Sequence, residues 1–347
     1  MVTASYVVAD EIAAGELYAS SGWTDGLPVV APTPERVAAC LEWGAFAPDQ
    51  VLGIEPVRAR ALTAEKVAIN AVLAGCQPPH FPVVAAAITA MCEEPFLLHG
   101  TTSSTGGCAV LIVVNGPIRR QLNMTGSFNA LGGADGASLV IGRAIRLALR
   151  NLLEVRPGGI DRSTLGHPGK ISFCLAEDEE GTPWLPLAQE RGIPADGTSA
   201  VTVLAASGPR QVMNEWTTDP AALLDTFVAE IKANMLNYSI FGGNYVIVIA
   251  PQLRTVFNDA GWTKADIRAY VHEHAFVYRR DWAGVGKGAV VGTSKADRVY
   301  RALPKGPDQL LVLAAGGPAG GFGAVIPPWL GHRTSAVTVP IGACASC

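Results

Sequence analysis

An apolar run, a Gly-Pro pair and a polar run follow one another in Val110-Leu-Ile-Val-Val-Asn-Gly-Pro-Ile-Arg-Arg-Gln-Leu122. This order predicts a buried strand, a sharp turn and the start of a helix. A similar order recurs in Tyr245-Val-Ile-Val-Ile-Ala-Pro-Gln-Leu-Arg-Thr-Val-Phe257. Strands that alternate with helices are typical of layered proteins of mixed structure. We therefore predict an α/β (or α+β) fold.

Each of these two stretches is flanked by predicted helices. The upstream helices span 81–93 and 223–235, and the downstream helices span 137–153 and 264–276. The repeated order indicates an internal duplication that gives two related α/β lobes with a middle insertion. We assign 1–160 to the N-terminal lobe, 161–200 to the middle segment, and 201–347 to the C-terminal lobe with its Cys-x-x-Cys tail. Any α/β protein has several turns of this kind after its strands. The prediction of a duplication therefore depends only on the repeated order of the elements.

The N-terminal part contains further predicted elements. A helix over 9–20 precedes a Gly-rich loop, and a short strand is expected over 29–32. Thr33 and Pro34 have the residue types that favour the N-cap and first position of a helix. Another helix is expected to run from Thr63 to Ala74 and to stop at Gly75.

Composition excludes several classes of protein. Of the 347 residues, 49% are apolar and 16% are charged, against an ordinary charged share of about 25%. The net charge is −4 and no basic block occurs, so a nucleic-acid partner is not expected. The apolar runs are strand-length, and no secretory signal is recognisable. We expect a cytoplasmic protein that does not enter membranes and that can form a homo-oligomer.

The seven cysteines form two groups. An odd number of cysteines without an export signal favours reduced thiols over a disulfide framework. Five are scattered among apolar neighbours and are expected to be small buried side chains, although Cys108 stands at the head of the strand that contains Val110. Cys344 and Cys347 form the Cys-x-x-Cys tail, which is either an ordinary chain end or a pair able to exchange a disulfide or bind a soft metal.

Two polar loops are candidate ligand sites. Gly100–Gly107 contributes Ser103, Ser104 and Thr105, whose hydroxyls and neighbouring backbone N–H groups suit an anion. Asp161–Lys170 places Arg162, His167 and Lys170 close together. The two cations suit a carboxylate or phosphate, and the imidazole can move protons near neutral pH. Each loop has an ordinary alternative as a solvated connection.

Other polar residues complete the set of candidates. Lys66 and Asn70 share one face of their predicted helix, and Asp25 is the candidate carboxylate of the N-terminal loop. Asn115 ends the strand that begins near Val110, and Glu177 follows another predicted strand. The two histidines His272 and His274 are two apart, which is poor spacing for one metal on a helix. The sequence identifies neither a metal nor a cofactor.

Several longer stretches resemble a poorly characterised bacterial family. They are Gly22-Trp-Thr-Asp-Gly-Leu-Pro-Val-Val, Thr63–Cys76, Val113-Val-Asn-Gly-Pro117, Asp161–Lys170 and the segment from Ala315-Gly-Gly-Pro to Val339-Pro-Ile341. Members of that family occur beside, or joined to, a UGSC-type (seleno)protein domain. The resemblance implies a thiol- or selenol-linked transformation of a small molecule and a UGSC-type protein as partner. This chain lacks the UGSC domain, and its Cys344-Ala-Ser-Cys347 end only loosely resembles the motif.

Two functional hypotheses follow. In the first, the protein is an enzyme whose small anionic or carbonyl substrate is held by the Gly100–Gly107 loop, Arg162 and Lys170. Cys108 or the Cys344/Cys347 pair is then the nucleophile or reductant, His167 and Lys66 assist catalysis, and a cofactor-free hydrolase or lyase is the alternative chemistry. In the second hypothesis the protein is a non-catalytic carrier of a thiol-bound ligand or metal. The number of polar loops favours the enzyme.

Overall fold

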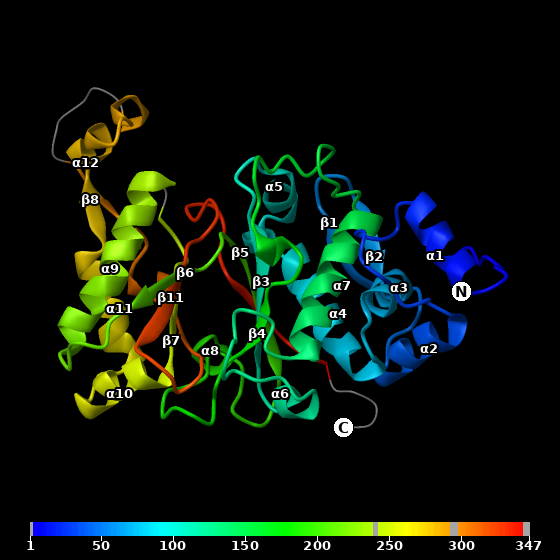
Figure 1. The fold of residues 1–347 in the computed structure, drawn as a ribbon, viewed down its shortest axis with the longest axis horizontal. Helices are drawn as coiled ribbons and strands as arrows, with labels where there is room; N and C mark the ends of the chain where they lie inside the picture. Colours follow the sequence, from blue (N-terminus) through cyan, green and yellow to red (C-terminus); the bar gives the residue numbers. More distant parts are fainter. Residues whose placement is uncertain (1–2, 239–241, 292–297, 343–347) are drawn as a thin grey trace.

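The computed structural model describes residues 3–238, 242–291 and 298–342. Two four-stranded mixed sheets pack face to face at the centre of the protein, and helices cover the outer face of each (Figure 1). Strand residues alternate between the layers. In the first sheet Leu111 and Val113 face the other sheet, whereas Ile112 and Val114 face the helices. The fold is thus of the α/β or α+β class, as the sequence predicts.

The first sheet has the strand order β12-β5-β3-β4. These strands are Val337–Pro340, Ala200–Ala206, Ala109–Asn115 and Cys174–Ala176. The pair β3 and β4 is parallel, and the other two pairs are antiparallel. As a result, the amino end of β3 lies beside the carboxyl end of β5, where Ala109 is paired with Ala206.

The second sheet has the strand order β10-β7-β11-β6. These strands are Leu311–Ala314, Val246–Ile249, Phe322–Ile326 and Arg210–Met213. The pair β10 and β7 is parallel and the others are antiparallel, so strand order and directions match those of the first sheet. The strands predicted in the stretches 110–122 and 245–257 are present as β3 and β7. A Pro turn connects β3 to the helix α6 (Ile118–Gln121) and β7 to the helix α10 (Pro251–Asp259). Common ancestry of the two halves stays a prediction.

The outermost strands are exchanged between the halves. β6 follows β5 along the chain but pairs with β11, and β12 follows β11 but pairs with β5. The segment 161–200 supplies β4 to the first sheet. Residue 200, where the predicted middle segment ends, is the first residue of β5. The proposed division at 160 and 200 stays a prediction.

Four helices build the layer outside the first sheet: α2 (Pro34–Trp43), α3 (Ala64–Ala74), α4 (Phe81–Cys92) and α7 (Gly136–Leu152). Their ends follow sequence signals. Thr33 caps α2 by accepting a hydrogen bond from the Arg36 amide, and Gly75 ends α3 with a φ of 97°, in the left-handed region that glycine favours. α1 (Glu11–Ser20) lies at the outer margin of this layer, near the N-terminus (Figure 1). The strand expected over 29–32 is absent, because these residues form no ladder with another strand.

Helices α9 (Pro220–Asn237), α10 and α11 (Lys264–His274) cover the second sheet. The remaining helices and strands are short: β1 (Val51–Glu55), β2 (Arg60–Thr63), α5 (Leu98–Ser103), α8 (Leu187–Glu190), β8 (Phe276–Tyr278), α12 (Arg279–Gly284) and β9 (Val299–Arg301). Half of the expected Gly100–Gly107 loop is therefore helical, since α5 continues to Ser103.

No single helix in the described ranges is long and apolar enough to cross a membrane. One bent pair, Pro78–Cys92 with Glu94–Ser103, has sufficient length and composition when taken together. Most of α4, which belongs to this pair, is buried against the first sheet.

Candidate functional site

The two predicted polar loops meet at the amino end of β3. The Thr164 amide donates a hydrogen bond to the Thr105 carbonyl over 3.0 Å. Gly107 has a φ of 70°, and a Cβ on it would lie 2.7 Å from the Cα of Gly166. Glycine is therefore required at position 107 for both its conformation and this close approach. The expected proximity of the segments 100–107 and 161–170 is observed.

A short polar cluster occupies the second of these loops. The Ser163 hydroxyl donates to Asp161 Oδ1 over 2.6 Å and accepts from Lys170 Nζ over 2.5 Å. Lys170 Nζ also contacts Asp161 directly at 2.9 Å, and Arg146 NH1 lies 3.6 Å from the same carboxylate. We call Asp161, Ser163 and Lys170 the Ser163 cluster.

The charge state of Asp161 follows from these contacts. The carboxylate is 3% exposed, and burial by itself raises its pKa. Hydrogen bonds from Ser163 and Lys170, together with the Lys170 charge, outweigh burial and leave the pKa of Asp161 below its ordinary value. Asp161 is therefore ionised at neutral pH and holds the ammonium and the hydroxyl in place.

A cavity of about 30 Å³ adjoins the Ser163 cluster. Both predicted loops contribute to its wall, the first through Thr101 and Thr102 and the second through Gly169 and Lys170. Cys108 and, from α7, Arg146 also line it. About 10–15 Å³ of such space is enough to hold one water molecule. The cavity thus admits a water molecule beside the Lys170 side chain, which is 19% exposed.

His167 is engaged on both ring nitrogens. Nδ1 accepts a hydrogen bond from the Gly169 amide at 3.2 Å, and Nε2 faces the Ala206 carbonyl at 3.4 Å. Burial lowers the pKa of His167, with Lys170 acting in the same direction, and the contact with Ala206 only partly offsets this. A neutral ring that donates through Nε2 and accepts through Nδ1 satisfies both contacts. His167 therefore shapes the loop, and no free ring nitrogen is available for proton transfer.

Cys108 is a buried thiol rather than a ready nucleophile. Its Sγ contacts the Thr101 carbonyl at 3.2 Å. Burial raises the pKa of Cys108 to about 12, and the nearby Lys170 charge compensates for only part of this. The other described cysteines are shifted in the same direction: Cys40 to about 11, Cys92 to about 12, and Cys76 and Cys174 well upward. Cys344 and Cys347 lie outside the described residues.

The remaining residues of the first loop mainly make local contacts. Ser104 accepts hydrogen bonds from the indole of Trp329 at 2.7 Å and from the Gly106 amide at 2.9 Å, while Ser103 donates to the His99 carbonyl. Tyr238, at the end of α9, donates to the Gly106 carbonyl. Thr105 is exposed, as is Arg162 in the second loop.

Three predicted residues lie apart from the Ser163 cluster, in the outer helical layer. Asp25 forms a two-pronged ion pair with Arg143 of α7, with both N–O distances at 2.8 Å. Asn70 is buried and is bonded to the Lys66 carbonyl and to Asn151. The Lys66 side chain is exposed. None of the contacts in the described ranges joins these side chains to Ser163, so their predicted roles there gain no support.

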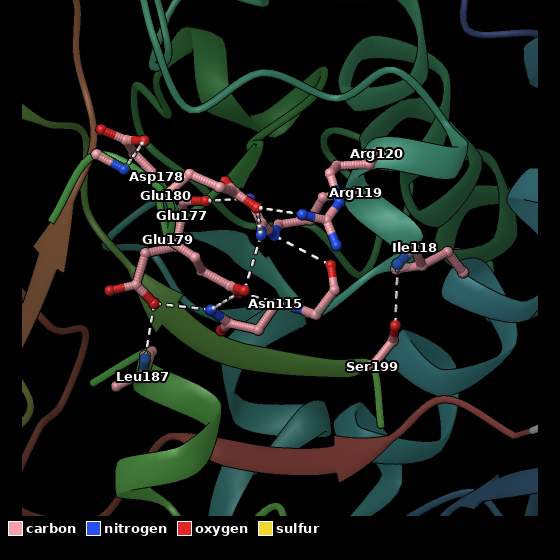
Figure 2. A network of polar contacts seen from close by, with 12 residues as sticks. Asn115, Ile118, Arg119, Arg120, Glu177, Asp178, Glu179, Glu180, Leu187 and Ser199 are labelled. Carbon is pink, nitrogen blue, oxygen red and sulfur yellow. Dashed lines mark hydrogen bonds and ion pairs between the residues drawn. The ribbon is translucent and has the colours of Figure 1, made fainter. Parts of the chain in front are cut away.

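The opposite edge of the first sheet carries a dense network of ion pairs (Figure 2). Glu177, 1% exposed, accepts hydrogen bonds from Asn115 Nδ2 and the Leu187 amide, both at 2.7 Å, and from Lys264 Nζ at 3.1 Å. Glu179 accepts from Asn115 and the Gly116 amide and pairs with Arg119.

The other acidic residues of this edge are paired as well. Hydrogen bonds from Arg119, which Arg120 supports electrostatically, hold the pKa of Glu180 below its ordinary value. Asp178 pairs with the buried Arg254 of α10. Asn115 and Glu177, predicted as substrate ligands, instead bind each other and neighbouring protein groups. The network connects β3 and β4 to α10 and α11, and substrate binding by Asn115 and Glu177 stays a prediction.

Sequence reasoning singled out Lys170 but missed its partners Ser163 and Asp161, and it missed Arg146, which contacts Asp161. The signal for the first two was local, because an Asp-x-Ser pair commonly forms a hydrogen-bonded turn. Arg146 had no such signal, since it reaches the cluster from α7.

The described residues contain no group of three or more His, Cys, Asp or Glu side chains that could hold a metal ion. The resemblance to the UGSC-associated family stays a prediction. No family model, curated protein or solved structure matches the chain.

Proposed function

We propose that the protein is a small-molecule enzyme of the hydrolase or lyase type that acts on a small anionic or carbonyl substrate at the Ser163 cluster. The observation that carries this proposal is the Ser163 hydroxyl, held between an ionised carboxylate at 2.6 Å and an ammonium at 2.5 Å. A serine with an acceptor for its proton and a cation beside its oxygen has the partners that an attacking hydroxyl needs.

Each residue of the cluster has a separate role in this proposal. Lys170 attracts the substrate oxygen on which negative charge develops. Ser163 Oγ attacks the carbonyl carbon and Asp161 accepts its proton, so that the new O–C bond forms as the O–H bond breaks. The bond between the carbonyl carbon and the leaving group then breaks, and the leaving group departs with the proton held by Asp161. In the second half, water attacks the acyl-serine and gives a proton to Asp161. The bond between the acyl carbon and Ser163 Oγ breaks, Asp161 returns the proton to Oγ, and the carboxylic acid is released. Gly107 allows the two loops to approach each other closely enough to form one wall around this site.

The thiol-dependent form of the prediction has weaker support. A thiol whose pKa is raised to about 12, as in Cys108, is protonated at neutral pH, and only the thiolate is a strong nucleophile. Thiol chemistry through Cys344 and Cys347, with a UGSC-type protein as partner, stays the alternative proposal, as does the role of a thiol or metal carrier.

The test uses p-nitrophenyl acetate as a small carbonyl probe. We expect the full chain to release p-nitrophenolate and to gain one acetyl group, located on Ser163 by peptide mass spectrometry. Ser163→Ala should remove the acetylation, and Lys170→Met should slow it at least tenfold. Lys170→Arg, which keeps the charge, should retain more activity than Lys170→Met.

The matched control is Lys305→Gln, because Lys305 is an exposed lysine remote in sequence from the cluster. This variant should acetylate at the unchanged rate. Acetylation of Ser163→Ala at the rate of the unaltered protein, or acetyl groups found only on surface lysines, would refute the assignment of Ser163.

A further inference from the structure

A second and larger cavity, of about 350 Å³, lies at the other edge of the protein. Its wall includes Val248 and Ala324 from the inner face of the second sheet, and the loop that follows β10 at Ala315. It is therefore at the carboxyl ends of the parallel strands β7 and β10, where open α/β sheets commonly bind ligands. The volume is within the range of small-molecule sites. The cavity adjoins neither Ser163 nor Lys170.

The chemistry of the wall is uniform. Its lining residues include no charged side chain, and most of them are glycine or alanine. Gly316 has a φ of 116°, and a Cβ on Gly317 would lie 2.2 Å from the ring of Phe128. Glycine at these positions thus lets Ala250 and Phe128 pack directly against the backbone, and the wall presents few large side chains. A charged ligand group would lose its hydration here without gaining a counter-ion.

Flat apolar surface and two carboxamides complete the site. Phe322, 40% exposed, lines the cavity, and the 61% exposed Phe128 packs on the backbone of Gly317. Gln211 of β6 is paired with Ala324 across the sheet, so both side chains point to the same face. The amide nitrogen of Asn129 donates a hydrogen bond to the Gly132 carbonyl at 3.3 Å. Each carboxamide offers both a donor and an acceptor.

We infer that this cavity binds an uncharged, flat heteroaromatic group, of the kind found in nucleobases and in aromatic carboxamides. Such a ring stacks or packs on the aromatic and glycine surfaces of the wall. Its ring nitrogens and carbonyl or amide groups match the carboxamides of Gln211 and Asn129. The site is independent of the proposed chemistry at Ser163.

The test compares two probes of nearly equal shape, nicotinamide and its anionic counterpart nicotinate, by isothermal titration and saturation-transfer NMR. We expect nicotinamide to bind at least tenfold more tightly than nicotinate. Ala319→Leu, which adds bulk at an exposed position of the cavity wall, should weaken nicotinamide binding at least tenfold. Gln211→Leu should weaken it about tenfold.

Ala47→Leu is the matched control, because Ala47 is also exposed and lies outside the cavity wall. This variant should bind nicotinamide as the unaltered protein does. Since nicotinate is a carboxylate that Lys170 could attract, its titration is repeated with Lys170→Met. Equal binding of the two probes in that variant, or nicotinamide binding unaffected by Ala319→Leu, would overturn the inference, whatever the outcome at Ser163.

Discussion

Replacing Lys264 by methionine removes the cation from the buried network while keeping most of the side-chain volume. Lys264 is 4% exposed and contacts Glu177 at 3.1 Å, Glu190 at 3.2 Å and the Leu185 carbonyl at 2.7 Å. Removing one partner of a buried ion pair typically costs 3–5 kcal/mol of folding free energy, because the other charge is left uncompensated, whereas exposed pairs contribute about 0–1 kcal/mol. Lys264 is at the start of α11, beside the second sheet, and Glu177 follows β4 of the first sheet. Losing their ion pair therefore weakens a contact between the two halves of the protein.

The expected magnitude lies at the lower end of that range. Glu177 still accepts hydrogen bonds from Asn115 and the Leu187 amide when Lys264 is absent, and Glu190 still pairs with Arg268 at 2.8 Å. We therefore expect Lys264→Met to lower the free energy of unfolding by about 3 kcal/mol. Adding Glu177→Gln should restore at least about 1 kcal/mol, because the amide keeps an acceptor but carries no charge.

The assay is equilibrium unfolding in urea, followed by tryptophan fluorescence and far-ultraviolet circular dichroism. Arg120→Met is the matched control, since Arg120 contacts Glu180 over the same 3.1 Å but is 67% exposed. It should change the free energy of unfolding by less than about 1 kcal/mol. A loss in Lys264→Met no larger than in Arg120→Met, or no recovery with Glu177→Gln, would refute the structural role of the network.

Three further predictions concern the Ser163 cluster and its surroundings. Gly107→Ala should lower the melting temperature in calorimetry, because φ is 70° and Gly166 is 2.7 Å from the new Cβ; an unchanged melting temperature would contradict the close approach. Asp161→Asn should reduce stability at pH 7 and make it less sensitive to acid. The pKa of Asp161 is lower in the folded protein than its unfolded value of about 3.9, so its stabilisation is present above that pH and is lost as the pH falls through the folded pKa; parallel urea-unfolding profiles of both proteins between pH 7 and pH 3 would disprove this. Cys108→Ala should acetylate with p-nitrophenyl acetate within about twofold of the unaltered rate, because the thiol is protonated; loss of the reaction would return Cys108 to the proposed chemistry.

Local signals predicted much of the fold. The apolar run that begins at Val110 predicted β3 correctly. This strand is apolar throughout because its alternate residues face two different hydrophobic layers. Thr33 and Gly75 correctly predicted the start of α2 and the end of α3. The same reasoning failed for 29–32, where residue type resembles a strand but no neighbouring strand is present to pair with it. Pairing is a long-range property, and a single sequence contains no direct record of it.

The candidate site was predictable only in part. Lys170 and the two polar loops were identified from residue type. The hydrogen-bond and ion-pair partners of each side chain were not identified, because these partners are far away in the sequence. Glu177 was interpreted as a substrate ligand, yet Lys264, 87 positions later, occupies one of its oxygens. The larger cavity was missed because glycine and alanine positions appear featureless in a sequence, although they make up most of the cavity wall.

Strand direction explains why the two candidate sites are on opposite edges. In a wholly parallel sheet all carboxyl ends meet at one edge, and ligands bind there. In the first sheet that edge carries Glu177 and its partners, so its buried charged side chains are already paired within the protein. The antiparallel strand β5 brings a carboxyl end to the opposite edge beside Cys108, and the Ser163 cluster lies there with its lysine partly exposed. The second sheet has the same strand order, but glycine and alanine at its carboxyl edge leave a cavity where the first sheet has ion pairs. Two sheets with the same strand arrangement thus provide a polar site at the amino end of β3 and a neutral cavity at the carboxyl ends of β7 and β10. The residue types at each edge determine whether it carries ion pairs, a polar site or a neutral cavity.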